Sequence, residues 1–357
     1  SMNYDLITLY GRHVRERNFC RRPLARGMQG VESKRGSSSH TTNPFAAIVS
    51  RGADEDHGIC YGFNLVYSGN FTAMAECDFN ATTRFILGIN PTDFSWKLEP
   101  GETFHTPEAV MVYSDQGLGE MSRRFHRFYN RNLVRGRWKT EKRPLLINSW
   151  EGALFDFDTD KLLAFADEAK KLGLEMLVMD DGWFGVKYPR LTDNCALGDW
   201  EVDRNKLPNG IGWLVEQAHK HGIKFGIWIE PEMTNTTSEL YEKHPEWVIK
   251  APEREVVKGR GGTQLVLDLG NPEVQDLVFG IVDDLLTENP EIDYIKWDAN
   301  MPISNHGSQY LSKDKQSHLY IEYHRGFAAV CDRIRAAYPD VTIQACASGG
   351  GRANWGV

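Results

Sequence analysis

The stretch YIKWDAN, residues 294–300, carries the pattern from which the fold can be worked out. Tyr294 and Ile295 begin an apolar strand, and the two-residue period of a strand then places Lys296 and Asp298 on the same side. Two interpretations of these unlike charges are open. They form either a buried salt bridge without a catalytic role, or a catalytic carboxylate that a neighbouring cation keeps ionised.

Strand-like and helix-like segments alternate on both sides of this stretch. The strand-like segments are PLLINSW, EMLVMDD, FGIWIEPEM, LVLDLG, YIKWDAN and VTIQACASGGG, and segments such as PEVQDLVFGIVDDLL separate them. Repeated βα units predict a parallel sheet with helices outside. We therefore expect an α/β fold containing a partial (β/α)8 TIM barrel of about six βα units, short of the eight strands that close such a barrel. The alternative, a doubly wound sheet, lacks a glycine-rich phosphate loop after its first strand.

The N-terminal part of the chain has a different residue pattern, without the alternation of strand-like and helix-like segments. Segments such as ICYGFNLVY, FTAMAECDF and TRFILGI are aromatic and β-branched, which is typical of antiparallel strands. Within residues 117–131, Leu118, Met121, Phe125 and Phe128 recur at three- and four-residue spacing, as in an amphipathic helix. We expect residues 1–135 to form part of an N-terminal β-sandwich with a linking helix. Residues 136–357 would form the catalytic barrel, incomplete at its C-terminus.

Composition narrows the class of ligand. Hydrophobic residues make up 41% of the chain and charged residues 25%, as in ordinary soluble globular proteins. A net charge of -8 and the lack of a long apolar run argue against nucleic acid or membrane as a partner. Six cysteines without CxxC spacing indicate neither a zinc site nor a disulfide framework, so we expect no metal and no cofactor. Reduced thiols and a start without a signal peptide favour the cytoplasm.

Polar and aromatic residues gather where the expected barrel strands end. They are Trp150, Asp180, Asp181, Glu230, Glu232, Lys296, Asp298, Cys346 and Ser348. In a (β/α)8 barrel the active site lies at the C-terminal ends of the strands, so these residues would converge on one mouth. This convergence favours the catalytic interpretation of Asp298.

The motifs NSWEG, MDDGWFG, LGDW, WIEPEM, IKWDAN and CASGGGR, in this order, resemble those of glycoside hydrolase family 36, especially the bacterial type. N-terminal stretches such as DLITLYGRHVRER and VESKRGSSSHTTNPFAAI extend the resemblance over almost the whole chain. The resemblance implies a retaining, exo-acting α-galactosidase that hydrolyses terminal α-galactosides of the melibiose and raffinose type by double displacement.

The resemblance also implies roles for individual residues. Asp298 would be the nucleophile, and Asp180 and Asp181 would bind the 4- and 6-hydroxyls of galactose. The remaining roles are contact with the 3- and 4-hydroxyls for Lys296, a place beside the 2-hydroxyl for Cys346 and Gly349, apolar walls for Trp150 and Trp200, and support for Glu230, Glu232, Asn300 and Ser348. A sugar-binding role for Arg260 is doubtful, because the glycine-rich run GRGGTQLVLD displaces it from the family position.

Retaining hydrolysis needs two carboxylates about 5 Å apart. The resemblance places the acid/base aspartate beyond the glycine-rich motif, in a segment outside this chain, so an isolated chain of residues 1–357 is predicted to be nearly inactive. Two alternatives remain open: an α-N-acetylgalactosaminidase of the same family, and a non-catalytic sugar-binding fragment. The resemblance further implies a homo-oligomer, possibly a tetramer, with SSSHTTNPF as a contact segment.

Overall fold

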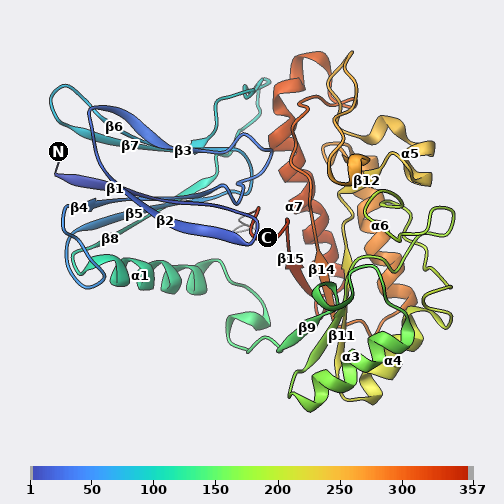
Figure 1. Cartoon of the computed structure of the whole chain (residues 1–357). Helices are drawn as coiled ribbons and strands as arrows, with labels where there is room; N and C mark the ends of the chain where they lie inside the picture. Colours follow the sequence, from blue (N-terminus) through green and yellow to red (C-terminus); the bar gives the residue numbers. More distant parts are fainter. Residues whose placement is uncertain (1–2, 353–357) are drawn as a thin grey trace. The chain divides into compact units, whose positions relative to one another are not determined.

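The computed structural model describes residues 3–352 and separates the chain into two compact units. The first unit comprises residues 1–142 with 348–357, and the second comprises residues 143–347. The first is built of antiparallel strands and one long helix, and the second alternates strands with helices (Figure 1). Each has its own hydrophobic core.

Two antiparallel sheets form the first unit. The larger has the order β2-β1-β4-β5-β8 and the smaller the order β3-β6-β7. Their strands are β1 (Tyr4–Arg12), β2 (Arg15–Pro23), β3 (Gly27–Glu32), β4 (Thr42–Ser50), β5 (Cys60–Val66), β6 (Phe71–Cys77), β7 (Thr83–Ile89) and β8 (Glu108–Ser114). Leu6, Ala46 and Leu65 of the larger sheet share one core with Phe71 and Ala73 of the smaller one. The predicted β-sandwich is thus confirmed.

Helix α1 (Gly117–Asn132) covers part of the other face of the larger sheet. Met121, Phe125 and Tyr129, four residues apart, pack on the sheet, while Phe128 is 37% exposed. The predicted helix is present, but its buried stripe ends in Tyr129 and not in Phe128. A regular four-residue step keeps the stripe on one side of the helix over these two turns. The short helix η1 (Arg137–Lys139) follows.

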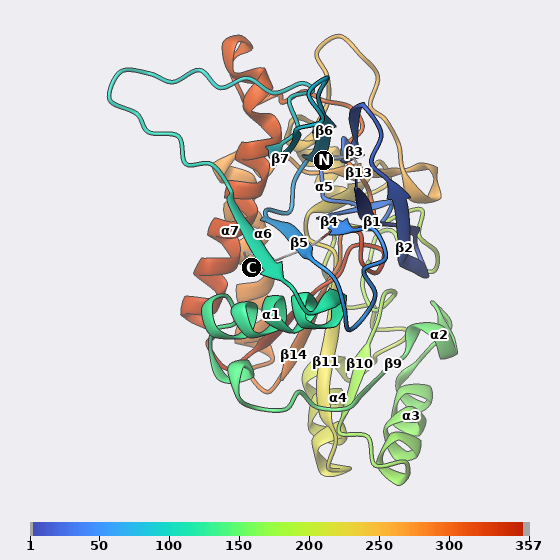
Figure 2. The same cartoon turned by 90° about the vertical axis from the view of Figure 1, so that its left-hand side faces the viewer.

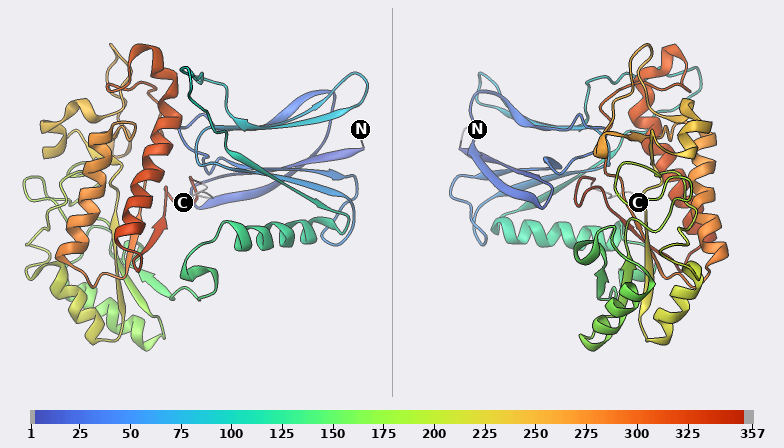
Figure 3. Two further views of the ribbon diagram at one scale, coloured as in Figure 1. Left: turned by 180° about the vertical axis from the view of Figure 1, so that it is seen from behind. Right: turned by 45° about the vertical axis from the view of Figure 1, so that its right-hand side comes forward.

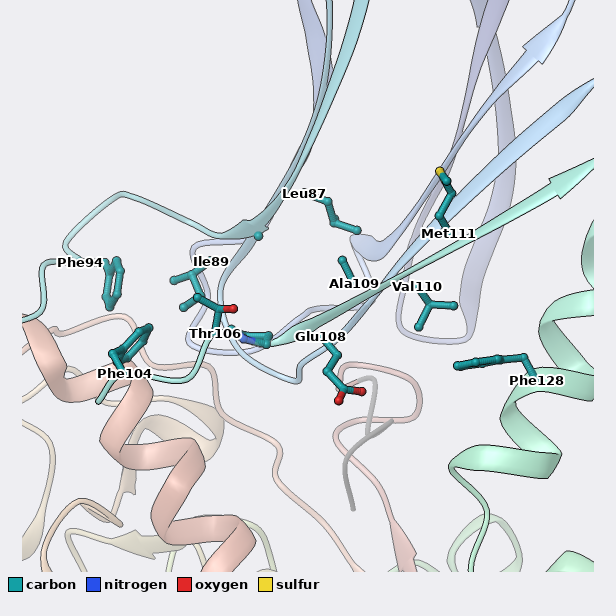
Figure 4. Close-up of a pocket in the computed structure, with 12 residues that line it drawn as sticks. Leu87, Ile89, Phe94, Phe104, Thr106, Glu108, Ala109, Val110, Met111 and Phe128 are labelled. Atoms are coloured by element: carbon teal, nitrogen blue, oxygen red, sulfur yellow. The ribbon is translucent and has the colours of Figure 1, made fainter. Parts of the chain in front are cut away.

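The sandwich also carries an apolar hollow of about 930 Å³ between β7, β8 and the long segment that joins them (Figure 4). Its lining includes Leu87, Ile89, Phe94, Phe104 and Val110. The rings of Phe94 and Phe104 lie 6.1 Å apart between centroids. These side chains make the joining segment part of the wall.

The second unit contains a parallel sheet in the order β15-β14-β11-β10-β9. Strands β14, β11, β10 and β9 are seen side by side in Figure 2. The strands are β9 (Leu146–Asn148), β10 (Met176–Met179), β11 (Lys224–Ile229), β14 (Tyr294–Trp297) and β15 (Thr342–Ala345). The helices are α2 (Trp150–Ala153), α3 (Thr159–Lys171), α4 (Gly210–Lys220), α5 (Glu239–Lys243), α6 (Pro272–Glu288) and α7 (Leu319–Ala337), with η2 (Pro245–Trp247), η3 (Arg260–Gly262) and η4 (Lys313–His318). Helices α6 and α7 pack against each other (Figure 3).

The sequences of these strands are apolar runs because their residues are largely buried. All four residues of β10 are buried, as expected for a parallel strand covered on both faces. The predicted α/β fold with a partial barrel is confirmed. No helix within residues 3–352 has both the length and the hydropathy needed to cross a membrane.

One expected barrel strand pairs differently. LVLDLG lies at β13 (Gln264–Val266), which pairs antiparallel with β12 (Met233–Asn235), and β14 pairs directly with β11. Among residues 3–352 the parallel sheet therefore has five strands, where six were expected. The reason is that another strand lies close enough to pair with β13. The chain beyond β11 turns back as β12, and next to this pair Leu267 N donates to Glu232 O at 2.9 Å.

Candidate active site

Polar side chains follow the parallel strands at one edge of the sheet. Asn148 ends β9, Asp180 and Asp181 follow β10, Glu230 follows β11, Asp298 follows β14 and Cys346 follows β15. Parallel strands in register bring these strand ends together, as the pairing of Ile229 with Trp297 and of Trp297 with Ala345 shows. The structure thus gathers these residues, all predicted except Asn148, at the C-terminal edge of the half-barrel.

Lys296 forms its ion pair with Asp180. Its Nζ donates to Asp180 Oδ2 at 2.7 Å, and Asn148 Nδ2 donates to the same oxygen at 2.6 Å. The sequence pattern placed Lys296 beside Asp298; the ion pair of the lysine is with Asp180, and Asp298 interacts with the lysine through its charge. The lysine is long enough to reach past β11 to the end of β10. Burial opposes the charge of Lys296, yet the attraction of Asp180, helped by Asp298, raises the pKa of the lysine.

Asp298 is held by three N–H donors. Asn300 Nδ2 and Trp228 Nε1 donate to its Oδ2 at 2.7 and 3.2 Å, and the backbone N–H of Ala299 donates to Oδ1 at 2.9 Å. The residue is 6% exposed. Donors from two strand ends therefore set the orientation of the carboxylate before any ligand arrives.

Glu230 connects to Asp298 through Asn300. Glu230 Oε1 accepts hydrogen bonds from the backbone N–H of Asn300 and, at 2.9 Å, from Gln264 Nε2. Burial, and then the negative charges of Asp298 and Asp181, raise the pKa of Glu230 to about 8. At neutral pH this carboxyl is mainly protonated, so it adds no second full charge beside Asp298.

Glu232 has a different setting from Glu230. Its Oε1 accepts from Trp297 Nε1 at 2.8 Å and its Oε2 from the Tyr323 hydroxyl of α7. The residue is fully buried. These hydrogen bonds fix Trp297, the neighbour of Asp298, against helix α7.

Arg190 is a site residue that the sequence interpretation missed. Its Nε and Nη2 donate to the two oxygens of Asp181 at 2.9 and 2.8 Å, and its Nη1 donates to Cys195 O at 2.7 Å. Burial outweighs the attraction of Arg190 and raises the pKa of Asp181. A lone arginine in a loop carries no pattern that names its partner. Asn148 was detectable, because it is a polar residue at the end of an apolar strand.

Aromatic rings surround Trp200. The ring centroids of Trp183, Phe184 and Trp228 lie 5.9, 4.5 and 6.2 Å from that of Trp200. Because Trp228 also donates to Asp298, the cluster borders the carboxylate. The position of Trp200 is therefore compatible with an apolar wall of the site.

Trp150 and Arg260 lie together at another part of the mouth. The guanidinium carbon of Arg260 is 5.7 Å from the Trp150 ring centroid, and Arg260 Nε is 2.9 Å from Asp193 Oδ2. The charge of Arg260 also lowers the pKa of Asp181, although burial dominates there. The glycine-rich insertion thus leaves Arg260 near two of the predicted site residues.

The glycine-rich motif is divided between the two units. Cys346 belongs to the second unit, where its backbone N–H donates to Trp297 O at 2.7 Å. Ser348 and Gly349 belong to the first, where Gly349 has φ +80° and a Cβ would lie 2.7 Å from Glu16 Oε1. In the part of the chain that the structure describes, no three His, Cys, Asp or Glu side chains are placed to hold a metal ion.

Carboxylates, a lysine and tryptophans at the C-terminal edge of a partial (β/α)8 barrel place the chain in the class of barrel proteins with an active-site mouth. The Melibiase family model matches residues 103–357, and the model of the glycosyl hydrolase family 36 N-terminal domain matches residues 1–99. The chain belongs to glycosyl hydrolase family 36.

Its relatives include alpha-galactosidase AgaA of Geobacillus stearothermophilus, which is 47% identical over 98% of this chain and 47% of the relative. Alpha-galactosidase Mel36A of Lactobacillus acidophilus is 43% identical over 98% of this chain and 47% of the relative. The crystal structure of AgaA matches with a TM-score of 0.95 and 46% identity, covering 99% of this chain and 48% of that one. The chain thus spans about half the length of these relatives.

Proposed function

We propose that this protein acts as a retaining, exo-acting α-galactosidase on terminal α-galactosides, with Asp298 as the nucleophile. The observation that carries the proposal is the Asp298 carboxylate, held by Asn300, Trp228 and the Ala299 backbone at the end of β14. A nucleophile that forms a glycosyl-enzyme bond must face one atom of the sugar, and three donors select that orientation. The relatives are named alpha-galactosidases, and variants of AgaA have been solved with stachyose and with raffinose.

Asp180, Asp181 and Lys296 would bind the sugar hydroxyls. Each carboxylate oxygen has two acceptor positions, so Asp180 Oδ1, which accepts from Asp181 N at 2.9 Å, has capacity for a hydroxyl as well. The ammonium of Lys296 has three hydrogens, one of which is directed to Asp180. Trp150 and Trp200 would cover the apolar faces of the ring, and Cys346 would lie beside it.

The acid/base carboxylate is not assigned within this chain. Glu230 is protonated at neutral pH, but it is 1% exposed and its Oε1 is held by Asn300 and Gln264, which suits support better than proton transfer to a leaving group. A carboxyl group other than Glu230 would have to protonate the leaving oxygen. Terminal α-N-acetylgalactosaminides are the alternative substrates.

A mechanism-based label tests the nucleophile. The protein is incubated with 2-deoxy-2-fluoro-α-galactosyl fluoride, and its intact mass and peptide map are measured. An adduct on Asp298 that is absent from Asp298→Asn supports the proposal. Inversion at the anomeric centre, or an adduct on another carboxylate, would contradict it. Melibiose binding without any labelling or turnover would favour the non-catalytic alternative. Comparing the hydrolysis of an α-galactoside with that of an α-N-acetylgalactosaminide identifies the preferred sugar.

We also propose a homo-oligomer in the cytoplasm. The six cysteines are free thiols, which suits a reducing compartment. SSSHTTNPF, residues 37–45, is buried or half-buried throughout and has little surface to offer another subunit, so the proposal does not use it. The apolar hollow of Figure 4 is the better candidate for a contact. Light scattering of the native protein measures the subunit number, and a strictly monomeric mass would contradict this assembly.

A further inference from the structure

A second hollow of the first unit, about 380 Å³ in volume, lies beside α1 on the outer face of the larger sheet. Ile7 of β1, Phe19 of β2 and Phe45 of β4 line it on the sheet side, and Phe125 lines it on the helix side. Helix α1 packs mainly on β5 and β8. The helix therefore leaves the β1 and β2 part of this face open, and the hollow occupies that place.

Two buried amides border this hollow. Asn43 of β4 and Asn64 of β5 are each 7% exposed. Within residues 3–352 the Oδ1 atom of Asn43 has no hydrogen-bond partner, whereas the side chain of Asn64 is hydrogen-bonded to Tyr129 of α1. The two residues are neighbours, because Phe45, two positions after Asn43, pairs with Asn64. An unsatisfied buried acceptor costs about 1–3 kcal/mol. Such an acceptor at the wall of a hollow, with a second amide beside it, indicates a place built for a hydrogen-bond donor.

The other polar groups of the hollow narrow the chemistry of its occupant. Arg17 and Glu55 bring opposite charges to the rim, and Ser122 and His126 add hydroxyl and imidazole groups from α1. Such a balanced set of donors and acceptors does not select an anion or a cation. Together with aromatic side chains it suits a neutral molecule that has several hydroxyls and an apolar face. The volume lies near the lower end of small-molecule sites, about 300–1,000 Å³.

We propose that this hollow, the amide pocket of Asn43 and Asn64, is a non-catalytic binding site for a neutral pyranose. A sugar hydroxyl donates to Asn43 Oδ1, Arg17 and Ser122 donate to ring or hydroxyl oxygens, and Phe45 and Phe125 pack on the C–H face. All of these groups belong to the first unit. The proposal goes beyond the α-galactosidase activity and does not depend on it.

Methionine methyl groups report separately on the two sites. Met121 lines the amide pocket, and Met179 ends β10 directly before Asp180. The protein carrying ¹³C-methyl methionine is titrated with methyl α-galactopyranoside, methyl β-glucopyranoside, glycerol and methylammonium. We expect a saturable shift of the Met121 signal with at least one pyranoside and none with the two small controls. A shift of the Met121 signal without a shift of the Met179 signal would weaken the proposal that the half-barrel binds α-galactosides. It would leave the proposal for the amide pocket intact.

Variants test the location. Ser122 is exposed on α1 and lines the pocket, so Ser122→Trp should fill it and weaken sugar binding at least tenfold without disturbing the core. Asn130→Trp, on the same helix but outside the lining, is the matched control and should keep wild-type binding. Asn43→Leu should abolish the response while leaving the protein folded. No Met121 shift with any sugar, an equal shift with glycerol, a shift only with methylammonium, or full binding by Ser122→Trp would each overturn the proposal.

Discussion

Arg190 binds both carboxylate oxygens of Asp181, at 2.9 and 2.8 Å, and the two side chains are only 2% and 4% exposed. The pair joins the end of β10 to the loop that leads to α4. A bidentate contact allows one orientation of the carboxylate. The loop thereby determines how Asp181 faces the mouth of the half-barrel.

Arg190→Met should lower the free energy of unfolding by about 3–5 kcal/mol, because it leaves the Asp181 charge buried without a partner. Urea unfolding of the native protein measures the loss. Arg260→Met is the matched control: its pair with Asp193 has side chains 37% and 32% exposed, so its loss should be below about 1 kcal/mol. Combining Arg190→Met with Asp181→Leu should restore part of the stability. Equal losses for Arg190→Met and Arg260→Met would contradict the assignment.

Glu230 should make stability fall as the pH rises. Its pKa is raised from 4.5 to about 8, so the folded protein holds a proton between these values that the unfolded chain has released. The stabilising contribution of the protonated carboxyl is present below pH 4.5 and is lost as the pH rises to about 8. Relative to Glu230→Gln, the wild type should lose at most roughly 5 kcal/mol over this window.

Unfolding curves at a series of pH values measure this difference. Glu253→Gln, at an exposed position, serves as the control for buffer effects. The assignment of a raised pKa to Glu230 would be wrong if the free energies of unfolding of the wild type and of Glu230→Gln changed equally with pH between 4.5 and about 8.

Asn300→Ala should reduce turnover more than binding. The side chain of Asn300 donates to Asp298 Oδ2 at 2.7 Å, and a hydrogen bond to a charged group contributes about 1.5–3 kcal/mol. For the hydrolysis of α-galactosides proposed above, kcat should fall by roughly 10- to 100-fold with little change in KM, since Asn300 would orient the proposed nucleophile Asp298. Asn305→Ala, in the same loop and bonded to Glu255 O, is the control. A rise in KM with unchanged kcat would argue against this role.

Two glycines in neighbouring helices should respond oppositely to alanine. A Cβ at Gly326 of α7 would lie 1.9 Å from Leu269 O, whereas a Cβ at Gly280 of α6 meets nothing within 4 Å. Gly326→Ala should destabilise the protein by at least about 2 kcal/mol, because the helix has to move off the backbone. Gly280→Ala should stabilise it by up to about 1 kcal/mol. Thermal unfolding distinguishes them, and similar melting temperatures would disprove the close packing of α7.

Local patterns predicted much of the fold and the composition of the strand ends. Apolar segments that stop at Asp180, Glu230 and Asp298 identify parallel strands, because both faces of such strands are covered and only their ends can carry charge. Periodicity also indicated helix α1. The patterns did not separate LVLDLG from a barrel strand, since three residues of β13 look alike whether they pair with β12 or with a parallel neighbour.

The sequence by itself determined the class of the fold, the strand ends that carry polar groups, and the family to which the chain is similar, since strand and helix periods and ordered motifs are local properties. Only the tertiary structure decided that Lys296 pairs with Asp180, that Arg190 holds Asp181, and that Asn300 links Glu230 to Asp298. These contacts join separate strands and loops, or depend on how a loop folds back. Which partner a charged side chain takes depends on distances and burial that exist only after the strands have come into register.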